Sequence, residues 1–228
     1  MASDPQALLR RVPLFKDVSD EVLTGLAPQL RRRAYRKGTM IFHKDQAGDA
    51  LYIIESGHVR IFLPAEGGDE LTIDLLASGD VFGDMALLDG RPRSASADAL
   101  EDTVTYTLGR DEFQHYLAET PRLASALIEL LSVRQRDLLE YTETLAFLDV
   151  HARIAKVLLD LANRYGTKVA EGIEIQMDLT QAELARMVGA TRERVNRALA
   201  SFRVQGVLEL RGKKIVILDA ERLRKRIY

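Results

Sequence analysis

The segment Phe82-Gly-Asp-Met-Ala-Leu-Leu-Asp-Gly-Arg-Pro-Arg-Ser-Ala95 combines residue types that suit a phosphate. Gly83 allows a ligand to approach the backbone closely, and the amides that open a short helix can bind an anion. Arg93 adds a planar pair of charged donors and Ser94 a hydroxyl donor, while Asp84 could accept from a sugar hydroxyl. The segment therefore predicts a phosphate site. The alternative is a plain turn in which Asp84 caps the helix and Arg93 pairs with a surface carboxylate.

A second group of residues has the layout of a helix-turn-helix between Leu179 and Gly206. Thr180 followed by Glu183 forms a capping box that starts the first helix, Gly189 lies at the turn, and Thr191 can cap the second helix. The apolar positions with helical spacing are Leu184, Val188, Val195, Leu199 and Phe202.

Charged side chains remain on the outer side of the second helix, near its start: Arg192, Glu193 and Arg197. In helix-turn-helix proteins this part enters the major groove, where Arg can bind guanine O6 and N7 and Glu can accept from cytosine N4. The pattern predicts DNA recognition, with a merely solvated charged face as the alternative. The residues expected at DNA are Thr180, Gln181, Thr191, Arg192, Glu193, Asn196, Arg197 and Lys213.

Two short strands are expected after this helix, Gly206–Leu210 and Lys213–Leu218, joined across Arg211-Gly212. Such a hairpin is a basic wing that can touch phosphates beside the groove. It can also cover the apolar underside of the helices, and the two roles are compatible.

Composition sets the broad class. At 228 residues the chain suits two domains of about 100–150 residues each. It lacks a run of about 18 apolar residues and an apolar signal core at its start, so we expect a cytoplasmic protein without a membrane span. The absence of cysteine excludes disulfides, thiolate zinc sites and cysteine-ligated iron–sulfur clusters. The four histidines show no paired spacing, so neither a metal nor haem is expected.

Charge is unevenly distributed along the chain. Residues 1–148 contain 16 Lys and Arg against 24 Asp and Glu, a net charge of −8, and residues 149–228 contain 16 against 10, a net charge of +6. A basic C-terminal part behind an acidic N-terminal part is consistent with DNA binding by the second half.

Residues 7–34 are predicted to form short helices, after which glycines divide residues 36–108 into short alternating segments. This pattern predicts a small antiparallel double sheet such as a jelly roll, with residues 64–69 as an exposed hairpin loop. The expected strands are Leu51–Ile54, Val59–Leu63, Leu71–Leu75 and Val104–Leu108.

From Asp111 the apolar period becomes helical, and a long helix is expected over residues 111–148. Its a/d positions form a seam that favours a dimer, with packing on the chain's own core as the alternative. Asp149 is expected to cap a helix over Val150–Tyr165, and Lys168–Asp178 to form a short β element. The seam residues are Ala124, Ile128, Leu131, Gln135, Leu138, Thr142 and Leu145.

Several motifs in this order resemble the cyclic-AMP receptor protein/fumarate-nitrate reductase regulator (CRP/FNR) family of bacterial transcription factors. Residues 38–57 match the spacing of its cyclic-nucleotide-binding β-roll, and Phe82–Ala95 resembles its phosphate-binding cassette. Residues 145–155 are similar to its hinge and following helix, and residues 191–197 to its recognition helix. The resemblance implies an α+β fold with a β-roll domain (1–110), a dimerisation helix and hinge (111–148) and a winged helix-turn-helix (149–228).

By resemblance, Gly83 and Ser94 would bind the cyclic phosphate of cyclic AMP or a related nucleotide, Arg93 would neutralise it, and Asp84 would meet the ribose 2′-hydroxyl. The family usually has Glu in place of Asp84, and the shorter Asp needs a closer sugar. Met85 and Ala86 complete the cassette on the same helix.

The chain also departs from the family on the long helix. A polar pair that meets the adenine amine is replaced by Leu138 and Leu139, which cannot form that hydrogen bond, and an unpaired buried amine costs roughly 1–3 kcal/mol. The base could turn instead toward other side chains, from either protomer. These are Arg134, Gln135, Thr142 and Glu143.

The resemblance implies a homodimer that binds a TGTGA-like palindrome as its effector fixes the recognition helices about 34 Å apart, with RNA polymerase as a further partner. Arg192 would then read a guanine, Glu193 a cytosine, and Arg197 a guanine or a neighbouring base. Two alternatives are an effector-independent regulator with a vestigial cassette and a nucleotide-binding module that controls a protein partner. Catalysis is not expected, because no nucleophile–base pair or acid/base carboxylate pair has an interpretable spacing.

Overall fold

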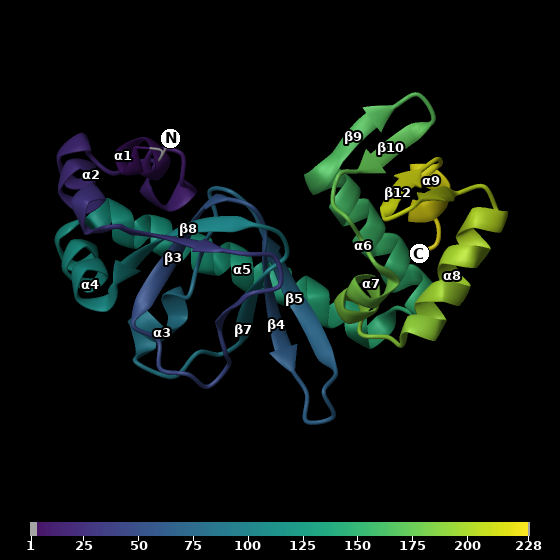
Figure 1. Ribbon diagram of the computed structural model, residues 1–228, viewed down its shortest axis with the longest axis horizontal. Helices are drawn as coiled ribbons and strands as arrows, with labels where there is room; N and C mark the ends of the chain where they lie inside the picture. The colour runs from purple at the N-terminus through teal and green to yellow at the C-terminus, as the bar shows by residue number, and fades with distance from the viewer. Residues whose placement is uncertain (1–3, 228) are drawn as a thin grey trace. The chain divides into compact units, whose positions relative to one another are not determined.

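The computed structural model describes residues 4–227 and divides into two compact units, with the division between Asp137 and Leu138. The first unit contains two antiparallel sheets and several short helices, and the second contains, within the described residues, four helices and a small sheet in addition to the end of a long helix (Figure 1). The predicted α+β class is confirmed, because the first unit is a β-roll and the second holds a helix-turn-helix.

The β-roll consists of two four-stranded sheets in which all neighbouring strands are antiparallel. Its expected strands are confirmed, and the hairpin loop follows β4 as predicted. The first sheet has the order β1-β8-β3-β6, with bounds Arg31–Tyr35, Thr103–Gly109, Ala50–Ser56 and Val81–Phe82. The second has the order β2-β7-β4-β5, with bounds Met40–Phe42, Ser96–Ala99, Val59–Pro64 and Glu70–Leu76.

The expectation of short helices over residues 7–34 is correct as far as Gln29 but wrong beyond it. The helical segments are α1 (Pro5–Leu9), η1 (Pro13–Phe15), α2 (Asp20–Leu26) and η2 (Ala27–Gln29). Residues 31–35 form the edge strand β1, whose side chains are exposed as far as Ala34. A strand that buries neither face shows no apolar alternation in sequence, so pattern analysis cannot detect it.

Two apolar clusters hold the roll. Alternate residues of β3 belong to different clusters, because successive side chains of a strand point to opposite faces of the sheet. Leu51 and Ile53 pack with the N-terminal helices, whereas Tyr52 and Ile54 pack with Phe82 between the sheets. The second cluster includes Phe82, the first residue of the predicted phosphate segment.

The predicted helix over residues 111–148 is interrupted. It consists of α4 (Arg110–Glu119) and α5 (Pro121–Phe147), which are separated at Thr120 (φ −121°, ψ 89°). Pro121 disfavours helical geometry in the residue before it and has no N–H to donate to the preceding turn. The interruption therefore follows from a proline that the helical periodicity concealed.

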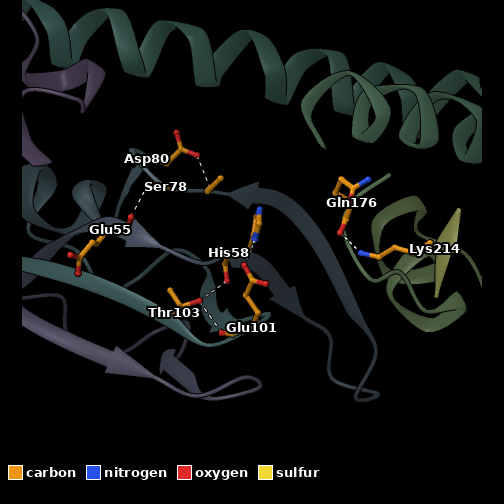
Figure 2. Close-up of polar contacts among 9 residues, drawn as sticks. Glu55, His58, Ser78, Asp80, Glu101, Thr103, Gln176 and Lys214 are labelled. Carbon is orange, nitrogen blue, oxygen red and sulfur yellow. Dashed lines mark hydrogen bonds and ion pairs between the residues drawn. The ribbon is translucent and has the colours of Figure 1, made fainter. Parts of the chain in front are cut away.

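Side-chain contacts brace the loops of the roll (Figure 2). His58 Nδ1 and Glu101 Oε1 are 2.5 Å apart, and Thr103 Oγ1 donates to the carbonyl of Glu101 at 2.9 Å. On another loop, Ser78 Oγ donates to the carbonyl of Glu55 at 2.8 Å. These contacts tie loops of the roll to neighbouring strands.

The second unit begins with the end of α5 and continues into α6 (Val150–Tyr165). Asp149 caps α6 as predicted, because its Oδ1 accepts from the Ala152 amide at 2.9 Å. The sheet of this unit has the order β11-β12-β10-β9. Lys214 on β12 donates to the carbonyl of Gln176, just after β10 (Figure 2). The remaining elements are β9 (Gly166–Val169), β10 (Gly172–Ile175), α7 (Gln181–Val188), α8 (Arg192–Val204), β11 (Leu208–Arg211), β12 (Lys214–Ile217) and α9 (Ala220–Arg224).

Among residues 4–227, no helix has the length and apolarity needed to cross a bilayer.

Candidate functional site

The predicted phosphate segment forms the short helix α3 (Asp84–Asp89) and the loop that follows it. Gly83 is the N-cap of α3 and has a φ of +80°. A Cβ at Gly83 would lie 2.7 Å from Nη1 of Arg93 and 3.2 Å from the carbonyl oxygen of Ala50. Glycine is therefore required here by both the backbone conformation and the space available.

Arg93 is buried, with 4% of its surface exposed. Its Nη1 donates to the carbonyl of Gly83 at 2.6 Å, and its Nη2 donates to the carbonyl of Ala50 at 2.8 Å. Nε is buried and has no hydrogen-bond partner within residues 4–227. Among the described residues, Arg93 does not form the surface ion pair that was considered as an alternative. A buried cation without a carboxylate partner is costly unless an anion can bind to it.

The guanidinium of Arg93 lies over aromatic rings. Its Cζ lies 4.4 Å from the centre of the Phe42 ring and 5.6 Å from that of Tyr52, and Tyr52 stacks on Phe82 at 4.9 Å. Burial lowers the pKa of Arg93, an effect that the nearby Tyr52 and Asp49 oppose. Burial also raises the pKa of the Tyr52 phenol. The rings hold the charge in place without neutralising it.

Asp84 is the second buried polar residue of the segment, with 2% of its surface exposed. Its Oδ1 accepts from Nη1 of Arg134 at 2.8 Å, while its Oδ2 is buried and has no partner within the described residues. The alternative in which Asp84 caps α3 is wrong, because Asp84 is the first residue of the helix and Gly83 is the cap. Arg134, considered above as a contact for the base, instead binds Asp84 and the carbonyl of Val81.

The remaining cassette residues lie on α3 and its loop. Ser94 is exposed and its Oγ contacts Sδ of Met85 at 3.6 Å, while Ala86 is buried. Sequence reasoning missed Arg110, whose Nη2 donates to the carbonyls of Gly48 (2.6 Å) and Ala86 (2.8 Å). Arg110 ties α3 to a distant loop, and no local pattern marks a contact that only the fold creates.

Leu138 and Leu139 lie on α5 in the second unit, with 50% and 55% of their surfaces exposed. Their expected place beside the base of an effector stays a prediction. Among residues 4–227, no group of three or more His, Cys, Asp or Glu side chains is placed to hold a metal ion.

The helix-turn-helix is built by α7 and α8. Thr180 and Glu183 form the predicted capping box, in which Thr180 Oγ1 accepts from the Glu183 amide at 3.1 Å and Glu183 Oε2 from the Thr180 amide at 2.6 Å. Gln181 is the first residue of α7, and Gly189 ends the helix with a φ of +61°. Thr191 caps α8 as expected, accepting from the amide of the third helical residue at 3.4 Å.

The outer face of α8 carries the predicted reading residues. Arg192, Glu193 and Arg197 are exposed and have no ion-pair partner in the described part of the chain. Asn196 is half-buried, and its Oδ1 has neither solvent exposure nor a partner within residues 4–227. The core-facing side of α8 is formed by Val195, Ala198, Leu199 and Phe202.

Two side chains hold the end of α7 from outside the motif. Arg153 on α6 donates from Nη1 to the carbonyl of Val188 at 2.9 Å and from Nε to that of Leu148 at 3.2 Å. Tyr141 on α5 donates to the carbonyl of Met187 at 3.3 Å. These bonds satisfy carbonyls that a helix end leaves unpaired, and so they fix the turn before α8.

The predicted wing is the β11–β12 hairpin. Its basic character is partly neutralised, because Arg211 pairs with Glu209 at 2.7 Å and Lys214 with Asp178 at 3.1 Å. Lys213 is exposed and has no ion pair within residues 4–227. Its carbonyl accepts from the Leu179 amide, which ties the wing to the start of the helix-turn-helix.

The chain joins a β-roll to a winged helix-turn-helix, and the roll contains a buried arginine that can bind an anion. This combination is that of a two-domain transcription regulator. Residues 32–120 match the model of the cyclic nucleotide-binding domain, and residues 152–226 match that of the Crp-like helix-turn-helix domain. The chain belongs to the CRP/FNR family, as the sequence motifs suggested.

Curated relatives support this assignment over the whole chain. The CRP-like cAMP-activated global transcriptional regulator of Mycobacterium tuberculosis is 36% identical over 219 residues, which cover 96% of this chain and 98% of the relative. The cyclic AMP receptor protein of Thermus thermophilus is 34% identical, with 91% and 93% covered. Among solved structures, the c-di-GMP responsive regulator CLP of Xanthomonas campestris matches with a TM-score of 0.79 at 27% identity, covering 87% of this chain and 99% of that one.

The protein is therefore a DNA-binding transcription regulator with a cyclic nucleotide-binding domain, and not an enzyme.

Proposed function

We propose that the protein is a homodimeric regulator whose affinity for a TGTGA-like palindrome is switched by a cyclic nucleotide, with cyclic AMP as the first candidate. One observation carries the effector assignment. Arg93 Nε and Asp84 Oδ2 are buried polar atoms of one segment, and each lacks a partner within residues 4–227. One is a donor that suits an anion and the other an acceptor that suits a hydroxyl.

A cyclic nucleotide would supply both groups, a phosphate charge and a ribose 2′-hydroxyl. Arg93 would neutralise the phosphate, Gly83 and Ser94 would donate hydrogen bonds to it, and Asp84 would accept from the sugar. Arg134 leaves one oxygen of Asp84 available for this role. The relative from Mycobacterium tuberculosis, which is named as a cAMP-activated regulator, supports the same class of ligand.

The base cannot be bound as it is by the polar pair usual in the family. In this chain Leu138 and Leu139 occupy those positions on α5, and their side chains have no donor or acceptor. A purine base would rest on these apolar side chains and send its polar edge elsewhere. Arg134 is engaged with Asp84, so Gln135, Thr142 and Glu143 are the other polar side chains of α5 for that edge. The exposure of all three in the single chain is consistent with this role.

A second copy of the chain is the proposed partner of α5. Ile128, Leu138 and Leu139 on this helix expose 66%, 50% and 55% of their surfaces. Ile128 and Leu138 lie on the heptad seam, as do the exposed polar residues Gln135 and Thr142, whereas Ala124, Leu131 and Leu145 are half-buried. An apolar seam of this length with polar interruptions is typical of a helix pair that sets its own register.

In the proposed complex, Arg192 reads a guanine, Glu193 a cytosine, and Arg197 a guanine or a neighbouring base. Lys213 contacts phosphate beside the groove, and RNA polymerase is the expected protein partner at the promoter. Effector binding would favour the dimer in which the two α8 helices lie about 34 Å apart, one turn of DNA.

The function is tested with fluorescence anisotropy of a TGTGA-N6-TCACA duplex, with and without cyclic AMP, at two salt concentrations. We expect tight binding only with the nucleotide, and weaker binding at higher salt because phosphate contacts release counterions. Equally tight binding without nucleotide would contradict the switch. Equal affinity for a scrambled duplex would contradict the operator.

The dimer is tested separately by light scattering of the Ile128→Glu variant, which places a charge on the seam. We expect the wild type to have the mass of two chains and the variant that of one. Glu129→Gln, an exposed position beside the seam, is the matched control. A monomeric wild type at micromolar concentration would contradict the proposal.

A further inference from the structure

The two helices of the motif begin in similar ways but differ at one position. Both have a threonine N-cap, Thr180 for α7 and Thr191 for α8. The third residue of α7 is Glu183, which completes the capping box, whereas the third residue of α8 is Arg194. Only the first half of a box is present in α8, and its single bond is longer, at 3.4 Å against 3.1 Å.

Arg194 is also unfavourable for α8 on electrostatic grounds. The first turn of a helix carries partial positive charge, so a cation there lowers stability and an anion raises it. Arg194 is exposed and has no ion-pair partner in the part of the chain that the structure describes. In α9 the third residue is likewise an arginine, Arg222, but its N-cap is the carboxylate Asp219, which offsets the charge. The neutral Thr191 gives Arg194 no such compensation.

The position of Arg194 around α8 indicates what it meets in a groove. Successive helical residues are turned by about 100°. Glu193 and Arg197 therefore lie on the centre of the outer face, with Arg192 on one flank and Arg194 on the other. A helix with its side chains is about 10–12 Å wide and the major groove about 12 Å wide. The first residues of a recognition helix contact base edges, so Arg192 at the tip of α8 can reach a base from its flank. Arg194 lies farther along the helix, and its flank faces a sugar–phosphate wall.

We propose that Arg194 binds a backbone phosphate on the flank of α8 opposite Arg192, and that α8 retains this arginine for DNA at the expense of its own cap. The proposal rests on the placement of α8 in the major groove given under the proposed function. It assigns Arg194 to positioning the helix on DNA, whereas base discrimination belongs to the residues on the centre of the outer face and at the tip of α8.

The test is the full-length Arg194→Gln variant, because Gln can complete the capping box without adding a negative charge. We expect stability and DNA affinity to change in opposite directions. In calorimetry, the transition of the DNA-binding unit should rise by about 2–5 °C. Affinity for the operator and for a scrambled duplex should both fall, and the slope of log K against log salt should become shallower by about 1.8, the value for two phosphate contacts in a dimer. If the two proteins bind equally at 1 M salt, that slope corresponds to about 60-fold weaker binding at 0.1 M.

The matched control is Arg222→Gln, which makes the same change at the same cap position of α9. It should leave the salt slope unchanged and should not raise the melting temperature. An Arg194→Gln protein with the wild-type slope, or with a loss confined to one base pair, would overturn the phosphate assignment. Lower stability of this variant would overturn the claim that Arg194 weakens the cap of α8. A wild type that does not prefer TGTGA would overturn the operator alone, because the scrambled duplex still reports the Arg194 contact.

Discussion

Arg134 holds Asp84 by one carboxylate oxygen at 2.8 Å, and the other oxygen of Asp84 faces no partner within residues 4–227. The ion pair gives this buried carboxylate one partner and leaves its second oxygen available to a ligand. The same guanidinium donates to the carbonyl of Val81, the first residue of β6. A side chain on α5 thus organises the segment that we propose as the sugar-binding part of the cassette.

Replacement of Arg134 by Gln should lower the free energy of unfolding of the first unit by about 3 kcal/mol, because it leaves Asp84 buried and unpaired. Urea denaturation followed by circular dichroism measures this change. The double variant Asp84→Asn/Arg134→Gln should recover most of the loss, since two amides can pair without charge. Additive losses in the double variant would show that the ion pair does not hold the segment.

Replacement of Arg93 by Lys should weaken cyclic AMP binding about 10–100-fold, as measured by isothermal titration calorimetry. Lys keeps the charge but loses the planar fork that bonds the Gly83 and Ala50 carbonyls and packs on Phe42. Arg91→Lys, at an exposed position two residues earlier, is the control. Wild-type affinity in the Arg93 variant would place the nucleotide elsewhere.

Replacement of Arg153 by Met should destabilise the DNA-binding unit by about 2–3 kcal/mol, because the carbonyls of Val188 and Leu148 lose their donors. Lys156→Met on the same helix removes only a partly exposed ion pair with Glu140 and should cost less than about 1 kcal/mol. The urea midpoints of unfolding of the two variants measure this difference in stability. Equal midpoints would mean that the end of α7 does not depend on Arg153.

The raised pKa of the buried Tyr141 phenol predicts a loss of stability at alkaline pH. Burial raises its pKa from the usual 10.0 to about 12, so the unfolded chain releases the phenol proton at a lower pH than the folded chain. The contribution of the protonated Tyr141 phenol to the free energy of unfolding is therefore complete below pH 10. It is lost as the pH rises from about 10 to about 12. We expect wild type to exceed Tyr141→Phe in unfolding free energy at pH 8, through its bond to Met187, and to lose that advantage by pH 11.

Urea denaturation of both proteins at several pH values tests this expectation, with the wild type and the variant sharing every other titrating group. A constant difference across the range would show that the Tyr141 phenol is not shielded from solvent in the folded protein.

Local patterns were sufficient to predict the elements whose signals lie within a few residues. The capping box of Thr180 and Glu183, the Asp149 cap and the Gly189 turn were all predicted from residue types alone, because caps and left-handed turns depend on neighbouring atoms of the chain. The strand β1 and the break at Thr120 were missed. The first buries no face, and the second depends on a proline within an otherwise continuous helical period.

By itself the sequence determined the order of the domains, the family motifs and the residue types of the cassette and of α8. Only the tertiary structure decided how those residues are engaged. It placed Arg93 between two carbonyls and an aromatic ring, assigned Arg134 to Asp84, and turned the Asn196 amide inward while Arg194 stays exposed. The physical reason is distance along the chain: Asp84 and Arg134 are 50 residues apart, and a pairing over that separation is set by the packing of the whole roll.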